Sequence, residues 1–167
     1  MLIRPMLATD IEVVEQLEQQ LFSSPWNSSR LQKALTGQHW MWISEVVEVD
    51  KAVSAGDRPS PLSSARRVVC GYLIASYGGG VADLLSIAVA ADFQRQGIAR
   101  QLLKALIEQL SSQQVESLFL EVRRSNHSAI ALYQQCQLQQ VGIRKGYYPS
   151  VQGREDAVVM RYGPRQD

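Results

Sequence analysis

The chain has 167 residues, of which 46% are hydrophobic and 20% charged, and its formal net charge is +1. This length and apolar content predict one compact domain, 1–167, with a continuous core. The near-neutral charge provides no general field for binding nucleic acid or an anionic membrane, so neither is expected as a direct partner.

The N-terminus lacks the apolar core of a signal peptide, and no run of residues reaches membrane-spanning length. The two cysteines, Cys70 and Cys136, have neither the spacing of metal ligands nor that of a disulfide framework. Both are interpreted as small buried hydrophobic residues. A cytoplasmic protein without a metal is therefore expected.

The N-terminal part alternates strands and helices. After a short strand at 2–4, Thr9-Asp10-Ile11-Glu12 has the pattern of a capping box that opens an amphipathic helix. Pro25-Trp26 ends that region, and Asn27 or Ser28 is expected to cap a short second helix.

Two strands are then expected, at about 40–49 and 67–77. The segment between them, 50–66, is polar and rich in proline. We interpret it as an inserted, mobile hairpin loop.

The second half continues the alternation from the turn at Gly78-Gly79-Gly80. Apolar periodicity predicts the remaining helices, and enrichment in residues that favour pleated surfaces predicts the remaining strands. The expected elements are a strand at 84–89, a helix at 98–112, a strand at 118–123, a helix that contains Tyr133, and strands at 138–145 and 155–162 around a Tyr147-Tyr148-Pro149 loop.

The stretch from Ser86 to Arg100 is the most informative part of the chain. An apolar strand pattern runs into a turn, and Gly97 stands at the start of the long helix. Free N–H groups and the helix dipole at such a position suit a diphosphate. Glycine also lets a ligand approach the backbone closely, although plain turn chemistry is the commoner reason for glycine there.

A second set of polar residues follows downstream. Glu121 interrupts a buried strand pattern, where a carboxylate is costly unless it is paired or hydrated. Ser125 or Asn126 is a candidate helix cap, and Tyr133 shares a helix face with Asn126 two turns later. This layout offers a base on a strand and a phenol on the next helix.

The chain resembles the GNAT-type N-acetyltransferases. The residues that carry the resemblance are Gln94-Arg95-Gln96-Gly97-Ile98-Ala99, which fit the pattern Q/R-x-x-G-x-G/A, together with Leu120-Glu121-Val122-Arg123 and Ser125-Asn126 before Ala131-Leu132-Tyr133. Two further stretches resemble the bacterial ribosomal-protein alanine N-acetyltransferases (RimI type). These are Pro25-Trp26, and Tyr147-Tyr148-Pro149 with Gly153-Arg154-Glu155-Asp156-Ala157.

The resemblance implies a mixed α/β (α+β) fold, in which a mostly antiparallel sheet splays between its fourth and fifth strands and is flanked by helices. It implies acetyl-CoA as cosubstrate and direct transfer in a ternary complex, with Glu121 as base and Tyr133 as acid. The acceptor would be the N-terminal alanine of a small-subunit ribosomal protein, and a monomer is expected. The residues implied for acetyl-CoA are Ile87, Ala88, Val89, Arg95, Gln96, Gly97, Ile98, Ala99, Arg100 and Asn126.

The chain departs from the family at two places. Gln137-Leu138 stands where members often carry a Gly-Phe pair, and 50–66 replaces a usually short turn. The first departure affects the expected turn and pocket lining, and the second has no assigned role.

Reference acidities favour an N-terminal amine as acceptor. An α-amino group has a pKa near ~7.8 and lysine near ~10.4, so the neutral fraction at pH 7 differs by roughly a few hundred-fold. A carboxylate such as Glu121 then suffices as general base, either directly or through a water. Direct transfer leaves no nucleophilic role for Cys136.

Each candidate also has a structural interpretation. Glu121 could pair with Arg123 or Arg124, and Tyr133 could be a buried aromatic with a satisfied hydroxyl. Trp26, Tyr147 and Tyr148 are candidates for binding the acceptor peptide, but each could simply pack. The Glu155-Asp156 pair could attract a basic peptide or merely open a strand, whereas neither His39 nor His127 is given a chemical role.

Three functions remain open at this point. The first is N-terminal alanine acetylation of a ribosomal protein, as the resemblance implies. The second is acetylation of other N termini, internal lysines or a small amine. The third is a non-catalytic acetyl-CoA-binding subunit, which the presence of both Glu121 and Tyr133 disfavours.

Overall fold

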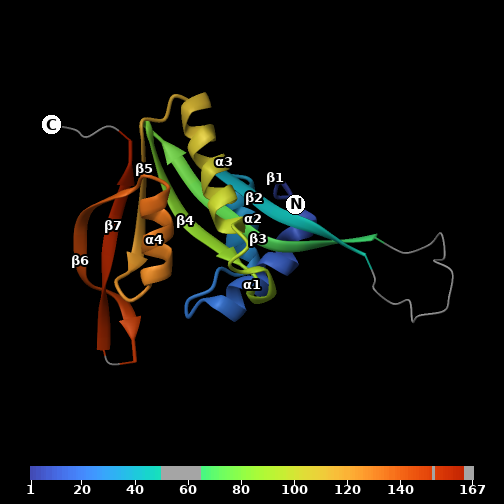
Figure 1. The fold of residues 1–167 in the computed structure, drawn as a ribbon, viewed down its shortest axis with the longest axis horizontal. Helices are drawn as coiled ribbons and strands as arrows, with labels where there is room; N and C mark the ends of the chain where they lie inside the picture. Colours follow the sequence, from blue (N-terminus) through green and yellow to red (C-terminus); the bar gives the residue numbers. More distant parts are fainter. Residues whose placement is uncertain (50–64, 152, 164–167) are drawn as a thin grey trace.

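The computed structural model describes residues 1–49, 65–151 and 153–163 (Figure 1). A seven-stranded sheet has the order β1-β2-β3-β4-β5-β7-β6. Only β4 and β5 pair in parallel, and every other neighbouring pair is antiparallel, which confirms the expected mixed sheet. The strands are β1 (Leu2–Pro5), β2 (His39–Val49), β3 (Ala65–Gly78), β4 (Val81–Val89), β5 (Ser117–Arg123), β6 (Gln139–Ser150) and β7 (Gly153–Tyr162).

Helices cover both faces of this sheet. In Figure 1, α3 (Ile98–Ser112) and α4 (His127–Gln135) lie in front of the sheet, while α1 (Ile11–Leu21) and α2 (Ser28–Leu35) lie behind it. The Asn27 side chain accepts the Arg30 N–H and so caps α2, as one of the two expected caps.

Two apolar clusters hold the helices to the sheet. On one face, the buried leucine stripe of α3 packs with Tyr133 of α4 and the inward residues of β4 and β5. On the other face, α1 and α2 pack on β2 and β3 through a separate set of residues. Helical spacing in the sequence predicts one core-facing stripe of Ala99, Leu102, Leu103, Leu106 and Leu110. The four leucines are buried, as predicted, and Ala99 is partly buried against the same cluster.

The expected capping box at Thr9 is wrong. A 3-10 turn, Ala8–Asp10, precedes α1, and the Asp10 carboxylate accepts the Leu7 N–H at 2.8 Å. Asp10 also accepts hydrogen bonds from the two terminal guanidinium nitrogens of Arg4, at 2.8 and 2.9 Å. This ion pair with β1 holds the Asp10 side chain over the 3-10 turn before the helix. Asp10 therefore accepts the Leu7 N–H and makes no capping hydrogen bond to α1.

The expected Tyr147-Tyr148-Pro149 loop is also wrong, because all three residues lie within β6. The register between β6 and β7 shifts between Arg144 and Tyr148, which lets one long strand bend and continue. Gly146 has φ +56°, and Arg154 of β7 donates to the carbonyl oxygens of Gly146 and Tyr147. The irregular part is thereby held to β7 instead of leaving the sheet.

The predicted insertion 50–66 falls mostly outside the described residues. Its last two positions belong to β3, which begins at Ala65, two residues earlier than expected. In Figure 1, β2 and the start of β3 extend beyond the rest of the sheet as a two-stranded ribbon.

The pairing of β4 with β5 is short. It runs from Val81 with Ser117 to Leu84 with Leu120, although β4 continues to Val89 and β5 to Arg123. On its other side β4 stays paired to β3, with a register shift that leaves Leu85 as an extra residue. In the described part of the chain, the second half of β4 thus pairs with β3 and not with β5. The expected splay between the ends of β4 and β5 stays a prediction.

Candidate active site

A tight turn joins β4 to α3. The 3-10 turn η2 (Ala91–Phe93) follows β4, and the Gln94 side chain donates back to the Val89 carbonyl at 3.0 Å. The Ala90 N–H donates to the Cys70 carbonyl on β3 at 2.9 Å. These bonds fix the chain direction just before the first turn of α3.

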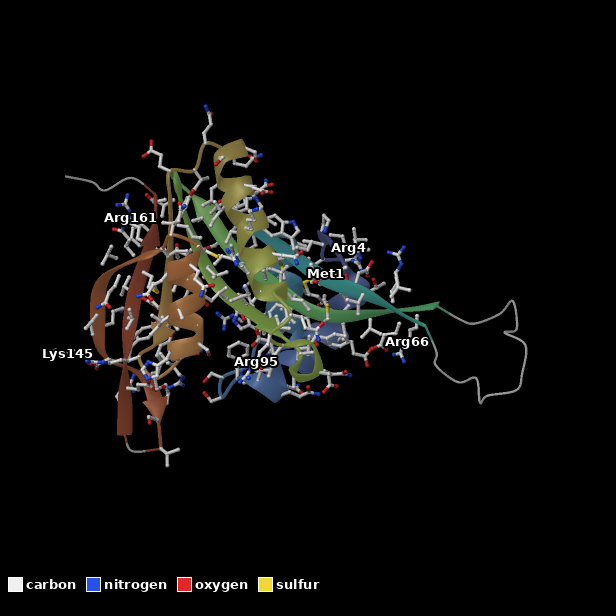
Figure 2. All side chains as sticks on the ribbon, in the orientation of Figure 1. Met1, Arg4, Arg66, Arg95, Lys145 and Arg161 are labelled. Atoms are coloured by element: carbon white, nitrogen blue, oxygen red, sulfur yellow. The ribbon has the colours of Figure 1, made fainter. Side chains whose placement is uncertain are left out.

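Two residues of this turn have left-handed backbone. Arg95 has φ +60° and Gly97 has φ +81°, and Figure 2 shows Arg95 in the loop before α3. A backbone that turns sharply in this way can direct N–H groups to one side, where they could hold an anion. A Cβ placed on Gly97 would meet no heavy atom within 4 Å, so the space in front of this backbone is open.

The first turn of α3 adds N–H groups that lack an intrahelical partner. Ile98 is buried in the core, so only its backbone is available to a ligand, whereas Arg95, Gln96 and Arg100 are exposed. The helix dipole favours an anion at the same end of α3. The turn therefore has the backbone geometry, charge and access that a diphosphate requires.

The last residues of β4 lead into this turn. Ile87, Ala88 and Val89 pair with Leu73, Tyr72 and Gly71 of β3. Gly71 allows that close pairing, because a Cβ there would lie 2.8 Å from the Ala88 carbonyl oxygen. An extended ligand could add to the other side of β4 through main-chain hydrogen bonds.

Glu121 extends from β5 into a cluster of polar and aromatic groups from β6. Its carboxylate pairs with Arg144, whose guanidinium also lies 4.2 Å from the centre of the Tyr147 ring. A hydrogen bond to Glu121 is the main cause that raises the pKa of Tyr147, and burial contributes next. Burial, followed by the Glu121 charge, raises the pKa of Asp83 on the neighbouring β4.

Tyr148 contacts the backbone of the same residue. Its hydroxyl donates to the Glu121 carbonyl oxygen at 3.0 Å, and its ring meets that of Tyr147 edge-on at 4.9 Å. Burial is the largest cause that raises the pKa of Tyr148 to about 12. The two tyrosines of β6 therefore contact the side chain and the main chain of Glu121.

Arg123, two residues after Glu121, links three parts of the chain. Its guanidinium donates to the Pro149 carbonyl at 2.9 Å and to the Glu155 carboxylate at 3.1 Å. It also donates to the Ser23 hydroxyl, between α1 and α2, at 3.3 Å. The segment between the first two helices is thereby joined to the tyrosine-bearing strand.

Tyr133 lies on α4, with 7% of its surface exposed, and packs in the same core as Leu120 and Val122, the neighbours of Glu121 on β5. Burial, followed by the influence of Tyr148, raises the pKa of Tyr133 above the usual range for tyrosine. Its hydroxyl therefore stays protonated through the neutral range. Asn126 caps the same helix, because its side chain accepts the Ala129 N–H at 3.2 Å.

The structure separates the predicted residues into groups. Glu121, Tyr147 and Tyr148 are in contact, whereas Tyr133 is buried on α4 against the core that also contains Leu120 and Val122 of β5. The predicted anion site occupies the turn between β4 and α3. Trp26 is 8% exposed and belongs to the α1–α2 core, where Arg30 stacks on its ring at 3.6 Å.

The partner of Glu121 differs from the two residues expected from the sequence. The interpretation that paired it with Arg123 or Arg124 is wrong, since those residues pair with Glu155 and Asp156 of β7. Arg144 is the partner instead. The strand β7 lies between β5 and β6, and its register places Arg144 opposite Ala157, the residue that pairs with Arg123 on β5, so Arg144 lies within reach of Glu121. The sequence feature that could have pointed to Arg144 is its place as a basic residue three positions before Tyr147.

Two further observations bear on the chemistry. Burial raises the pKa of the Cys136 thiol, which keeps it a poor nucleophile. In the described residues, no group of three or more His, Cys, Asp or Glu side chains is arranged to hold a metal ion. Among the same residues, every helix is too short or too polar to cross a membrane.

Comparison with known proteins agrees with this geometry. A ribosomal protein bS18-alanine N-acetyltransferase of Salmonella typhimurium is 35% identical over 91% of this chain and 90% of its own length. The corresponding protein of Haemophilus influenzae is 34% identical over 92% of both chains. The crystal structure of the ribosomal-protein-S18-alanine N-acetyltransferase from Escherichia coli superposes with a TM-score of 0.76 at 30% identity, covering 96% of this chain and 91% of that one.

The family match covers both the turn before α3 and the Glu121–Tyr133 region. Residues 12–137 match the Acetyltransferase (GNAT) family, and the parallel β4–β5 pair within an otherwise antiparallel sheet is the arrangement expected for it. The chain is an N-acetyltransferase that belongs to the GNAT family.

Proposed function

We propose that this enzyme transfers the acetyl group of acetyl-CoA to the N-terminal alanine of a small-subunit ribosomal protein. The main support is the similarity to ribosomal protein bS18-alanine N-acetyltransferases along nine-tenths of the chain. The contacts of Glu121 with Arg144, Tyr147 and Tyr148 add a chemical reason. Glu121 is a carboxylate whose partner in this structure is the Arg144 guanidinium. The acceptor amine could take the place of that guanidinium beside Glu121.

The donor would lie along β4 and the turn before α3. Main-chain groups of Ile87, Ala88 and Val89 would bind the pantetheine arm, and the turn from Arg95 to Arg100 would hold the diphosphate. Asn126 has its side-chain oxygen engaged by the Ala129 N–H, which leaves its amide nitrogen as the group for the arm.

The reaction would proceed by direct attack in a ternary complex. The α-amine forms a bond to the thioester carbonyl carbon, and Glu121 takes the amine proton directly or through a water. Collapse of the tetrahedral intermediate breaks the carbon–sulfur bond, and the Tyr133 hydroxyl gives its proton to the departing thiolate. The products are the N-acetylated peptide and coenzyme A.

The assignment of Tyr133 predicts a pH profile. The rate should rise with pH as the acceptor ammonium, with a pKa near ~7.8, loses its proton. An acid works while it is protonated, and burial raises the pKa of Tyr133 above the ordinary value for tyrosine, which is about 10. No fall in rate is therefore expected below about pH 10. Tyr133→Phe should lower kcat by roughly 10²-fold across this range. Measurement of kcat/KM from pH 6 to 10 checks both statements. A downturn centred below pH 9 that disappears in Tyr133→Phe would contradict them.

A panel of acceptor peptides tests the proposed substrate. We expect rapid transfer to a peptide with the N-terminal sequence of ribosomal protein bS18, and none when its α-amine is blocked. A peptide with only an internal lysine should react at least ~100-fold more slowly, because so little of that amine is neutral. Transfer to many free N termini would indicate a broader α-amine acetyltransferase. Acetyl-CoA binding without transfer to any peptide would favour a small-amine enzyme or a regulatory subunit.

A further inference from the structure

A buried carboxylate lies beneath the segment between α1 and α2. Glu18, in the last turn of α1, is 1% exposed. Its Oε2 accepts the Trp26 N–H at 3.0 Å, and its Oε1 accepts the hydroxyls of Tyr72 at 2.5 Å and Ser86 at 2.8 Å. The ion pairs found among the described residues do not include Glu18.

A buried carboxylate held by hydrogen bonds alone is costly compared with an apolar side chain of similar volume. Core packing therefore gives no reason for glutamate at this position. The reason for a glutamate here lies in the groups that its carboxylate joins. Ser86 and Tyr72 lie on β4 and β3, whereas Trp26 lies in the connection between α1 and α2. Glu18 thus fastens this connection to the strand proposed to bind the donor.

The same connection touches the catalytic side of the molecule. Ser23 accepts a hydrogen bond from Arg123, which follows Glu121 by two residues and also holds the Pro149 carbonyl of β6. The segment from Ser23 to Trp26 is therefore fixed at one end by Arg123 and at the other by Glu18. Its position relative to Glu121 depends on both attachments.

We propose that Glu18 is a positioning residue for the acceptor. By holding the Trp26 backbone to β3 and β4, it fixes the Ser23–Trp26 segment as a wall along which the acceptor peptide approaches Glu121. This inference rests on the proposed function for the identity of the acceptor. It requires nothing of the Trp26 ring, which is buried in the core.

The test separates acceptor binding from donor binding. Glu18→Ala removes the only side chain that accepts the Trp26 N–H, and we expect the KM for the bS18 N-terminal peptide to rise about tenfold or more. The KM for acetyl-CoA should stay within about twofold of the parent value. Glu18→Gln should restore the peptide KM to within about threefold, because an amide oxygen can still accept the Trp26 N–H while its nitrogen faces the two hydroxyls.

Tyr72→Phe is the matched control. It removes one hydrogen bond from the Glu18 carboxylate within the same core but leaves the bond to Trp26 in place. We expect a lower melting temperature and an unchanged peptide KM. An equal rise in Tyr72→Phe and Glu18→Ala would overturn the proposal, and so would an unchanged peptide KM in a folded Glu18→Ala protein.

Two further measurements keep the test decisive. If Glu18→Ala does not fold, Glu18→Asp is compared with Glu18→Gln. Aspartate keeps the charge but withdraws the carboxylate by one methylene, so its peptide KM should be the higher of the two. Equal values would count against the proposal.

Hydrogen exchange of the Trp26 amide gives a readout without any substrate. It should be faster in Glu18→Ala and unchanged in Tyr72→Phe. If the parent enzyme modifies none of the peptides, the proposed function fails. The exchange rates would still show whether Glu18 holds the segment, and equal rates in all variants would refute that attachment.

Discussion

We expect Glu121→Gln to lower kcat by roughly 10²- to 10⁴-fold, the usual contribution of a general base. An amide keeps the shape of the side chain but cannot take a proton from the acceptor amine. The affinity for acetyl-CoA should change little, because the proposed donor contacts lie on β4 and the turn before α3. Steady-state kinetics with the bS18 peptide and calorimetric titration with acetyl-CoA measure the two quantities separately.

Stability should not account for that loss. Glu121 and Arg144 are partly exposed, with 29% and 54% of their side-chain surfaces accessible, and ion pairs of this kind add little to folding. The melting temperature of Glu121→Gln should therefore match that of Glu12→Gln, a change at an exposed position of α1. A large loss of acetyl-CoA affinity, or an unaltered kcat, would show that Glu121 is not the base.

The second large effect is expected at Gly97. Gly97→Ala should weaken acetyl-CoA binding by roughly 10- to 100-fold, as expected if one hydrogen bond from the backbone to a charged phosphate is lost. Two causes act together. A side chain at φ +81° strains the turn, and the added methyl group occupies the open space in front of the backbone where the diphosphate is proposed to bind.

Gly80→Ala separates these causes. Gly80 has φ +79°, and a Cβ there also meets nothing within 4 Å, but it lies in the turn between β3 and β4. Both substitutions should cost roughly 1 kcal/mol of folding free energy from left-handed backbone strain. Only Gly97→Ala should weaken acetyl-CoA binding, as measured by calorimetry. Equal binding losses would mean that the turn before α3 acts through stability alone.

The order and type of the elements could be predicted because their signals are local. The stripe of α3 depends on helical periodicity within one segment, and the Asn27 cap depends on a side chain acting three residues along the chain. Gly97 at the start of α3 was likewise recognised from the sequence as a turn position, and its backbone has φ +81°.

The errors arose where distant residues decide the local structure. Arg4 draws Asp10 away from the start of α1, and Arg154 holds the bend that keeps Tyr147 within β6. The pairing of Glu121 with Arg144 depends on the placing of β7 between β5 and β6, which no spacing within either strand reveals. For the same reason, the buried carboxylate of Glu18 had no signal beyond its place on the apolar face of α1.

The two apolar clusters have a consequence for how this enzyme can diverge. The buried residues of the α1–α2 face and those of the α3–α4 face form separate sets that share only the backbone of the sheet between them. Tyr133 belongs to the second set, and Trp26 belongs to the first. Substitutions that reshape the first layer can therefore accumulate without repacking the second. The acceptor specificity of the enzyme could in this way change during evolution while its reaction with the acetyl-CoA thioester stays the same.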